Sequence, residues 1–378
     1  DTLWQWVMFN DFAIGVNGAT SGTNPVKVNA AGTASLLANA PFAKYIEVWN
    51  NRIWLVESTA ANRNTIRASA INLPEDWTID DDAGAITLPI DPNDGDYIKG
   101  IKAFQGSLYV EKEEKINVVN PIGAPATIPA NLRVDIHTTK VGSISGYSIQ
   151  NVVNDQLFLT KSGVISLVLA PLGNLQGALI SENIKELGQL KKTSDEMASF
   201  VLDDIKQYWL SIPSTISSSG FNELWVLDYA KISERDERNF PIVRWVKFDG
   251  LVAGTAYTQR KDQTYNRVLI AGYPVSGQNT KIYQYDPINP AKAFNDNTAA
   301  YTQNIKSKAF SSGSPLIREL WHRFGAALRI ITATLNLNVN YYFNNSRTIT
   351  GTFPYIFTSS SGGTLWGGST WNGGLWTS

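Results

Sequence analysis

The chain has 378 residues, of which 43% are hydrophobic and 17% charged, and its 32 basic and 33 acidic side chains give a net charge of −1. This balance excludes the strong positive field that DNA-binding domains use, and the charged share lies below the usual value of about 25%. The absence of cysteine excludes a disulfide framework, a thiolate metal site and a cysteine nucleophile.

The chain opens at Asp1 and enters a strand-like segment, residues 3–9, almost at once. We interpret this start as the interior of a longer structure, from which an N-terminal part has been removed or left out. The sequence contains no uninterrupted apolar stretch of membrane-spanning length and no signal-peptide pattern, so neither a transmembrane helix nor a leader is predicted.

A hairpin unit recurs along the first half of the chain: an apolar strand, a two-residue turn and a second apolar strand. The copies pair residues 6–9 with 12–16, 45–49 with 52–56, 101–104 with 107–110, and 150–153 with 156–159. Their turns are Asn-Asp, Asn-Asn, Gln-Gly and Asn-Asp, which suit the positive φ angles of type I′ turns. A β-sandwich would also contain such hairpins, but their regular recurrence favours a propeller.

Weaker copies occur at residues 198–212 and 256–271, and one or two further strands follow most hairpins. The copies begin near residues 6, 45, 101, 150, 198 and 256, and these intervals fit one four-stranded blade each. We therefore predict an all-β chain in which residues 1–295 form a six-bladed β-propeller. Helical patterns are limited to residues 181–187 and, more weakly, 193–198.

The sequence changes character after residue 295. Residues 334–342 alternate strictly, with Leu335, Leu337 and Val339 on one face and asparagines on the other, which is typical of a half-buried strand. We predict that residues 296–360 form a β-rich extension, either the last part of the final blade or a small β-appendix.

The last segment, residues 361–378, is rich in glycine and carries Trp366, Trp371 and Trp376 at intervals of five residues. Such a segment loses much conformational entropy when it becomes ordered and has no core of its own. Evenly spaced tryptophans are good anchors on a partner surface. We predict that these three residues contact either another protein or the rest of the same chain.

Several short motifs resemble tail proteins of tailed bacteriophages. They are residues 9–18 (FNDFAIGVNG), 44–46 (KYI), 51–56 (NRIWLV), 73–77 (LPEDW) and 163–166 (GVIS), together with the terminal Trp-Gly-Gly ladder. In this order they are similar to the β-propeller tail-hub proteins of short-tailed phages, described as packaged-DNA stabilisation or tail-nozzle proteins. The resemblance covers most of the chain and is densest between residues 9 and 170.

The resemblance implies a structural virion protein of the phage tail, assembled in the host cytoplasm. Such a protein forms a homo-oligomeric ring, often a hexamer, that acts as hub or nozzle, continues the DNA channel below the portal, helps to retain packaged DNA and takes part in DNA ejection. Its partners would be copies of itself, the portal or adaptor, other tail proteins and passing DNA, bound without sequence specificity. The family has no catalytic residues that could be carried over.

Two groups of acidic residues could carry chemistry. Residues 80–82 and 91–96 (DPNDGD) could bind calcium, but the glycine comes one place early and Lys102 replaces the expected glutamate, which favours a solvated loop. Glu111, Glu113 and Glu114 could supply half of a carboxylate pair for sugar cleavage. Lysines alternate with these glutamates, which favours an exposed, charged strand end.

The only histidines are His137 and His322, and neither stands near a nucleophile elbow or a second imidazole. No phosphate-binding loop and no dinucleotide fingerprint is present. We therefore predict no catalytic, cofactor-binding or metal-binding residue and no enzymatic activity.

A basic group near His322 has two interpretations. Lys306, Lys308, Arg318 and Arg323 could face DNA phosphates in a channel, or could form a subunit contact or a solvated surface.

The aromatic residues leave an alternative function open. Trp49, Trp54, Trp209 and Trp225 lie inside strand patterns and are predicted to fill the core between blades. Exposed aromatics clustered on loops at one face would instead indicate a glycan- or host-receptor-binding propeller. A secreted propeller hydrolase is a third possibility, and it would need convergent carboxylates that the sequence does not reveal.

Overall fold

The computed structural model describes residues 3–20, 25–79, 83–122, 131–168, 179–181, 184, 197–213, 223–230, 234 and 243–248, and describes the strands between 253 and 358 by their backbone. The chain divides into two compact units, Asp1–Asp286 and Pro287–Ser378. The described part is all-β, with two short 3-10 turns, η2 (Gly146–Ser148) and η5 (Asp203–Ile205). No helix in this part is long and apolar enough to cross a membrane.

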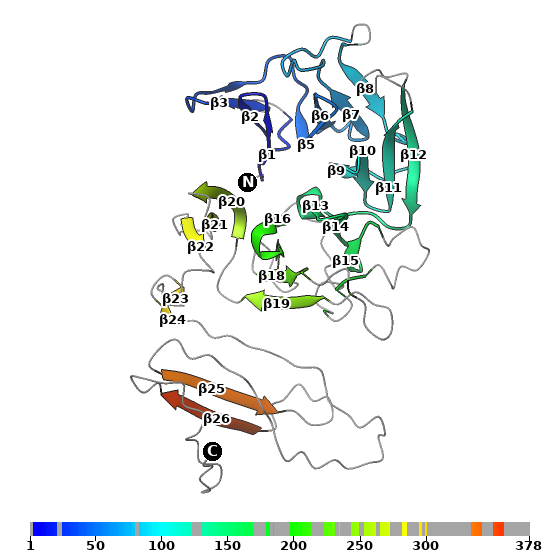
Figure 1. Ribbon diagram of the computed structural model, residues 1–378. Coiled ribbons are helices and arrows are strands. Elements are labelled where there is room, and N and C mark those ends of the chain that lie inside the picture. The colour runs from blue at the N-terminus through cyan, green and yellow to red at the C-terminus, as the bar shows by residue number, and fades with distance from the viewer. Residues whose placement is uncertain are drawn as a thin grey trace, which may run out of the picture. The chain divides into compact units, whose positions relative to one another are not determined.

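The first unit contains a β-propeller of five blades, each a sheet whose antiparallel strands follow one another in chain order (Figure 1). Blade 1 is β1 (Gln5–Phe9), β2 (Phe12–Val16), β3 (Val26–Asn29) and β4 (Ala34–Leu36). Blade 2 is β5 (Ala43–Trp49), β6 (Arg52–Glu57), β7 (Thr65–Ala68) and β8 (Ile86–Pro89). Blade 3 is β9 (Ile98–Phe104), β10 (Ser107–Lys112), β11 (Lys115–Pro121) and β12 (Leu132–Thr139).

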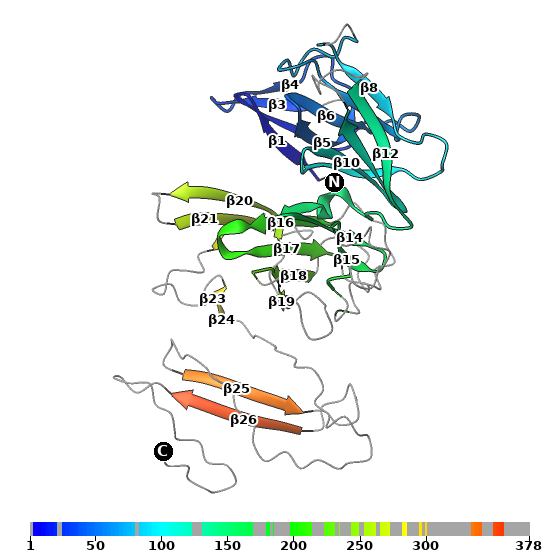
Figure 2. The same ribbon diagram turned by 45° about the vertical axis from the view of Figure 1, so that its right-hand side comes forward.

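Blade 4 is β13 (Gln150–Val152), β14 (Asp155–Thr160) and β15 (Gly163–Ser166). Blade 5 is β16 (Ala198–Leu202), β17 (Gln207–Ile212), β18 (Glu223–Asp228) and β19 (Arg244–Phe248). Figure 2 shows the four strands of blade 5 lying one beside the next.

The predicted count of six blades is wrong, because the propeller has five. The hairpin expected at residues 256–271 is present as β20 (Ala253–Lys261) and β21 (Tyr265–Gly272), which form a three-stranded ladder with β22 (Ile282–Tyr285). A hairpin forms through neighbouring residues alone, whereas a blade is defined by the sheets that cover its two faces. Counting hairpins therefore overestimated the number of blades.

Consecutive blades bury their apolar faces against each other. Strand β6 shows this division, because Ile53 and Leu55 belong to the cluster with blade 1, whereas Trp54 and Val56 belong to the cluster with blade 3. Two further clusters join blade 3 to blade 4 and blade 4 to blade 5. Each buried large side chain contributes about 1.5–3 kcal/mol, so these clusters hold the described blades in order.

The four tryptophans predicted as core residues are buried. The exposed fractions of Trp49, Trp54, Trp209 and Trp225 are 6%, 1%, 0% and 9%. The alternating pattern predicted their burial correctly because blades 2 and 5 are covered at these positions.

The hairpin turns follow the predicted chemistry in blades 2 and 3. Asn50 and Asn51 both have positive φ, and so do Gln105 and Gly106, as type I′ turns require. In blade 1 only Asn10 of the predicted Asn-Asp pair has positive φ.

The turn of blade 4 differs from the prediction by one residue. Val152 pairs with Asp155, so Val153 and Asn154 form the turn, and Val153 takes a φ of 54° although it is β-branched. The Asp155 carboxylate accepts a hydrogen bond from Ser166 Oγ at 2.6 Å, which ties Asp155 into the sheet. Tertiary contacts thus outweigh the local turn preference of Asn154-Asp155.

The predicted helix at 181–187 falls largely outside the described residues. Ser181 and Ile184 are described, and the Ile184 N–H donates to Ser181 O at 2.8 Å in a turn. The Ser181 hydroxyl accepts a hydrogen bond from Val164 N–H in blade 4 at 2.9 Å.

The second unit contains β23 (Asn295–Asp296) with β24 (Ala299–Ala300), and β25 (Thr334–Tyr341) with β26 (Gly351–Thr358). Strand β25 matches the alternating segment expected at 334–342 and pairs with β26 along its whole length.

Candidate functional site

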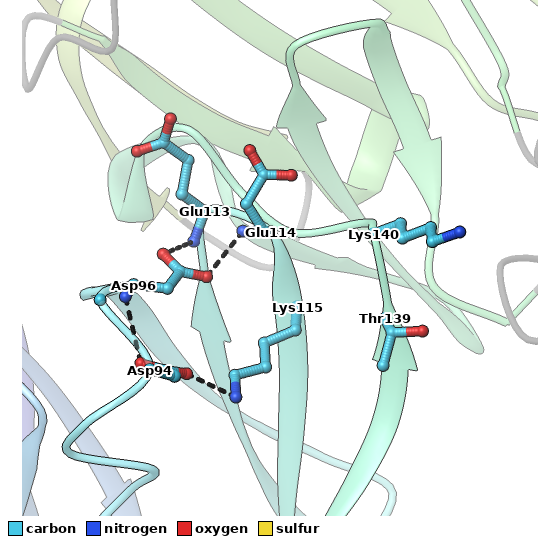
Figure 3. A pocket seen from close by; sticks show the side chains of 8 residues that line it. Asp94, Asp96, Glu113, Glu114, Lys115, Thr139 and Lys140 are labelled. Carbon is cyan, nitrogen blue, oxygen red and sulfur yellow. Dashed lines mark hydrogen bonds and ion pairs between the residues drawn. The ribbon is translucent and has the colours of Figure 1, made fainter.

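A shallow surface cavity of about 470 Å³ lies at one end of blade 3. It is lined by Asp94, Gly95, Asp96, Glu113, Glu114, Lys115, Thr139 and Lys140 (Figure 3). The loop between β8 and β9, the turn between β10 and β11, and the end of β12 bring these residues together. Both the possible calcium loop at 91–96 and the possible catalytic glutamates Glu113 and Glu114 lie at this end of blade 3.

The carboxylate of Asp96 closes the turn between β10 and β11. It accepts the backbone N–H groups of Glu113 and Glu114 at 3.0 and 2.9 Å (Figure 3). These donors would otherwise be unpaired at the turn, so Asp96 has a structural role.

Asp94 neutralises a lysine that is completely buried. Lys112 has a side chain with 0% exposure, and its ammonium donates to both Asp94 carboxylate oxygens at 3.0 and 2.9 Å and to Asp91 O at 3.0 Å. Burial would raise the pKa of the Asp94 carboxyl, but hydrogen bonds from Lys115 and Lys112 outweigh it and lower the pKa below its ordinary value. Asp94 is therefore ionised at neutral pH and bound to lysine.

Asp91 is held in the same way. Its carboxylate accepts hydrogen bonds from Lys115 Nζ at 2.7 Å and from Asn117 Nδ2 at 2.9 Å, and these two bonds lower the pKa of Asp91. The carboxylates of Asp91, Asp94 and Asp96 are all engaged by nitrogen donors. Within the described residues, no group of three or more potential ligands is arranged to hold a metal ion. Residues 80–82 lie outside the described residues.

The glutamates at the cavity rim are paired with lysines. Glu113 accepts from Lys161 at 2.9 Å and lies 3.6 Å from Lys99, and Lys161 also contacts Glu114. The hydrogen bond with Glu114, followed by the one with Glu113, raises the pKa of Lys161. Glu113 and Glu114 share Lys161 as a partner, so neither carboxylate is free to act as the acid or the nucleophile of a sugar-cleaving pair.

The prediction of an exposed strand end is wrong for Glu111. The Glu111 side chain is 0% exposed. Glu113 is half-buried and Glu114 is exposed, as expected. A β-bulge between Glu111 and Lys112 breaks the simple alternation of sides in β10, and loops from both neighbouring blades cover the strand end.

His137 lies on β12 in an aromatic contact. Its ring stands edge-on to Tyr109, with centroids 5.2 Å apart, and burial lowers the pKa of its imidazole. Within the described part of the chain, none of the contacts of His137 is with a nucleophilic side chain. His322 lies outside the described residues.

The motifs that carry the phage-tail resemblance have structural roles. Arg52 is 0% exposed, and its guanidinium donates to Ser69 O at 2.6 Å and to Gly84 O, which fastens both ends of the β7–β8 connection to β6. Trp77 is also buried and donates its indole N–H to Pro74 O at 3.0 Å.

The neighbouring Glu75 joins two blades. Its carboxylate accepts from Lys27 of β3 at 2.7 Å and from the Ala38 N–H at 3.5 Å. The LPEDW motif at 73–77 therefore fastens the loop of blade 2 to blade 1.

One face of β1 is apolar and exposed. Trp6 and Met8 lie on one side of β1 and Trp4 directly precedes the strand. Trp4, Trp6 and Met8 are 40%, 47% and 71% exposed, and together we call them the Trp4 face. The two indoles stack with centroids 5.4 Å apart, and the Trp6 ring lies over Gly15, where a Cβ would come within 2.7 Å of it. The sequence does not reveal this face, because the alternation of β1 does not tell which side of the strand is covered.

The interface residues predicted at the C-terminus, Trp366, Trp371 and Trp376, lie outside the described residues. The same holds for the basic group Lys306, Lys308, Arg318 and Arg323. Their predicted roles as subunit or DNA contacts stay predictions.

Comparisons with known proteins match no family model and no curated protein. Among solved structures, the chain is similar to PorZ, a surface component of the type-IX secretion system of Porphyromonas gingivalis, with 8% identity and a TM-score of 0.33 over 79% of this chain and 40% of PorZ. It is also similar to apo AztD from Citrobacter koseri, with 13% identity and a TM-score of 0.30 over 66% of this chain and 63% of AztD. The chain thus matches less than two thirds of the length of either protein.

Proposed function

We propose that this chain is a structural virion protein of a short-tailed phage tail. In this proposal it forms a homo-oligomeric ring, a hub or nozzle, that continues the DNA channel below the portal and helps to retain packaged DNA. It acts through interfaces and carries out no catalysis.

The observation that best supports this proposal is the role of the motif residues. Arg52, Glu75 and Trp77 belong to the segments that resemble tail-hub proteins, and each has a structural role. Arg52 fixes the β7–β8 connection to β6, Glu75 joins blade 2 to blade 1, and Trp77 lies in the apolar cluster that these two blades share. Because the motifs consist of residues that hold the fold together, the resemblance indicates a protein that acts as a scaffold. The lysine-bound carboxylates of the blade 3 cavity fit the same interpretation.

The Trp4 face supports assembly. Trp6 and Met8 on β1 and Trp4 directly before it form an exposed apolar row, and such patches often mark contact surfaces. The net charge of −1 gives little repulsion between copies of the chain.

Light scattering of the purified chain, with and without portal and adaptor proteins, combined with negative-stain images, tests this proposal. We expect rings, either of the chain alone or after the partners are added. The variant Trp6→Ser should weaken ring formation, whereas Ile79→Ser, at a single exposed isoleucine outside the motifs, should leave it unchanged. A chain that stays monomeric with these partners and binds a glycan array would contradict the proposal and favour the receptor-binding alternative.

A further inference from the structure

Glu111 is a buried acid without a compensating partner. Its side chain is 0% exposed, and neither carboxyl oxygen has a hydrogen-bond partner among the described residues. Buried polar groups are almost always hydrogen-bonded, and an isolated buried carboxylate is very costly. The position of Glu111 therefore needs a physical explanation.

The surroundings of Glu111 are polar and belong to three blades. Residues 141–149, which we call the interblade linker, connect blade 3 to blade 4 and place Ser143, Ser145 and Ser148 in the interior, each 0% exposed. The Ser143 and Ser148 hydroxyls donate to Ser145 O at 2.9 and 2.7 Å, while the Ser145 hydroxyl has no partner in the described residues. Tyr208 of blade 5 donates to Ser148 O at 2.8 Å.

The linker is tightly packed against blade 3. A Cβ on Gly142 would lie 2.1 Å from Lys112 O, and one on Gly146 would lie 2.1 Å from Lys99 O. The Ser143 N–H donates to Lys112 O at 2.8 Å, and the Ile144 N–H donates to Leu159 O of blade 4 at 2.9 Å. A change at Glu111 is thus transmitted directly to contacts between blades.

The nearby charged groups are engaged elsewhere. Lys112 binds Asp94, Lys115 binds Asp91 and Asp94, and Lys99 and Lys161 bind Glu113. Tyr208 is the titratable group of blade 5 that interacts with Glu111, and its pKa is raised by burial, with the Glu111 charge adding to the effect.

Burial also sets the protonation of Glu111. It raises the pKa of the Glu111 carboxyl well above the ordinary value of 4.5. The nearby Ser143 hydroxyl opposes this only in part, because it donates its hydrogen bond to Ser145 O. A neutral acid also removes most of the cost of burying the group.

We propose that Glu111 is an uncharged acid in the folded protein and acts as a pH-sensitive switch, because loss of its proton loosens the junction of blades 3, 4 and 5 at the interblade linker. The direction of the pH effect follows from linkage between protonation and folding. The stability contributed by neutral Glu111 is fully present below the ordinary pKa of a glutamate, and it is lost as the pH rises through the pKa of Glu111 in the folded state. The inference does not depend on the proposed phage-tail function.

The test compares the wild type with Glu111→Gln, which keeps the shape and stays neutral, and with Glu114→Gln as an exposed control. Melting temperatures are measured from acidic to alkaline pH, together with hydrogen exchange of residues 141–149. We expect the melting temperature of the wild type and of Glu114→Gln to fall by several degrees as the pH rises, with faster exchange in the linker. Glu111→Gln should lack this part of the pH response.

Two results would overturn the proposal. One is an identical pH response of the wild type and Glu111→Gln. The other is stabilisation of the wild type, but not of Glu111→Gln, by added calcium or potassium, since a bound cation would then accompany an ionised Glu111. If Glu111→Gln does not fold, infrared spectra of the wild type decide the matter, because a protonated carboxyl band must be present at neutral pH and disappear at alkaline pH.

Discussion

At the scale of single residues, stability depends on buried polar groups whose partners are backbone carbonyls or single carboxylates. Arg52 and Lys112 are both 0% exposed, and each satisfies groups that come from loops distant in sequence. Removing one partner of such a pair leaves the other unpaired in the interior, which costs more than the hydrogen bond contributes.

Replacement of Arg52 by methionine should destabilise the protein strongly. The carbonyls of Ser69 and Gly84 would lose their donor inside blade 2, so we expect the free energy of unfolding to fall by about 2–5 kcal/mol. Chemical denaturation measures this change. Arg63→Met is the control, because Arg63 is exposed over the Tyr97 ring and should matter little; equal effects of the two variants would contradict the assigned role of Arg52.

Replacement of Asp94 by asparagine should weaken the blade 3 end and its resistance to acid. The buried Lys112 ammonium would lose its carboxylate partner, so we expect a loss of about 2–3 kcal/mol at neutral pH. The pKa of Asp94 is lowered in the folded state, so its contribution is full above the ordinary aspartate range and is lost as the pH falls through the folded-state value.

Urea denaturation at neutral and acidic pH measures both effects. The Asp94→Asn variant should be less stable at neutral pH and should lose less stability on acidification than the wild type. Asp135→Asn is the matched control, because Asp135 pairs with Arg133 on the surface at 2.8 Å, and it should change the profile much less. An unchanged acid response in Asp94→Asn would show that Lys112 does not depend on this carboxylate.

At the scale of elements, turn residues set the strand register, and the interblade linker sets how blade 3 meets blade 4. The Asn-Asn turn of blade 2 and the Gln-Gly turn of blade 3 follow the local preference of these residues for positive φ. Val153, by contrast, accepts a positive φ because Asp155 is bound within its sheet. In the linker, small residues are required by space, since Gly142 and Gly146 lie against backbone carbonyls.

Replacement of Gly146 by alanine should disrupt the linker. The new Cβ would meet Lys99 O at 2.1 Å and the Tyr45 ring at 2.6 Å, so backbone must move, and we expect a cost of about 3 kcal/mol or more. Gly95→Ala provides the comparison: its φ is 76° but no atom lies within 4 Å, so about 1–2 kcal/mol is expected. Thermal unfolding of both variants measures the difference, and a milder effect at Gly146 would refute the close packing.

At the scale of the whole molecule, the described core is a chain of contacts between consecutive blades. All four apolar clusters lie within the first unit, so the described core does not require residues 287–378. The Trp4 face is the exposed apolar strip of blade 1, on the side of β1 opposite to its cluster with blade 2.

A fragment that ends at residue 286 should therefore fold. We expect it to keep the β-sheet circular dichroism of the full chain and a cooperative thermal transition, because every described cluster is retained. Comparison of its melting curve with that of the full chain, supported by limited proteolysis, measures this. A fragment without a cooperative transition would show that residues 287–378 complete the core of the first unit.

The sequence by itself determined the all-β class, most strand positions, the hairpin turns of blades 2 and 3 and the burial of Trp49, Trp54, Trp209 and Trp225. These features depend on alternation and turn preference, which act between residues close together in the chain. The tertiary structure alone decided the number of blades, the turn at Val153, the lysine partners of Asp91 and Asp94, the burial of Glu111 and the exposure of the Trp4 face. Each of these depends on which distant loop or sheet covers a given side, and a strand pattern does not contain that information.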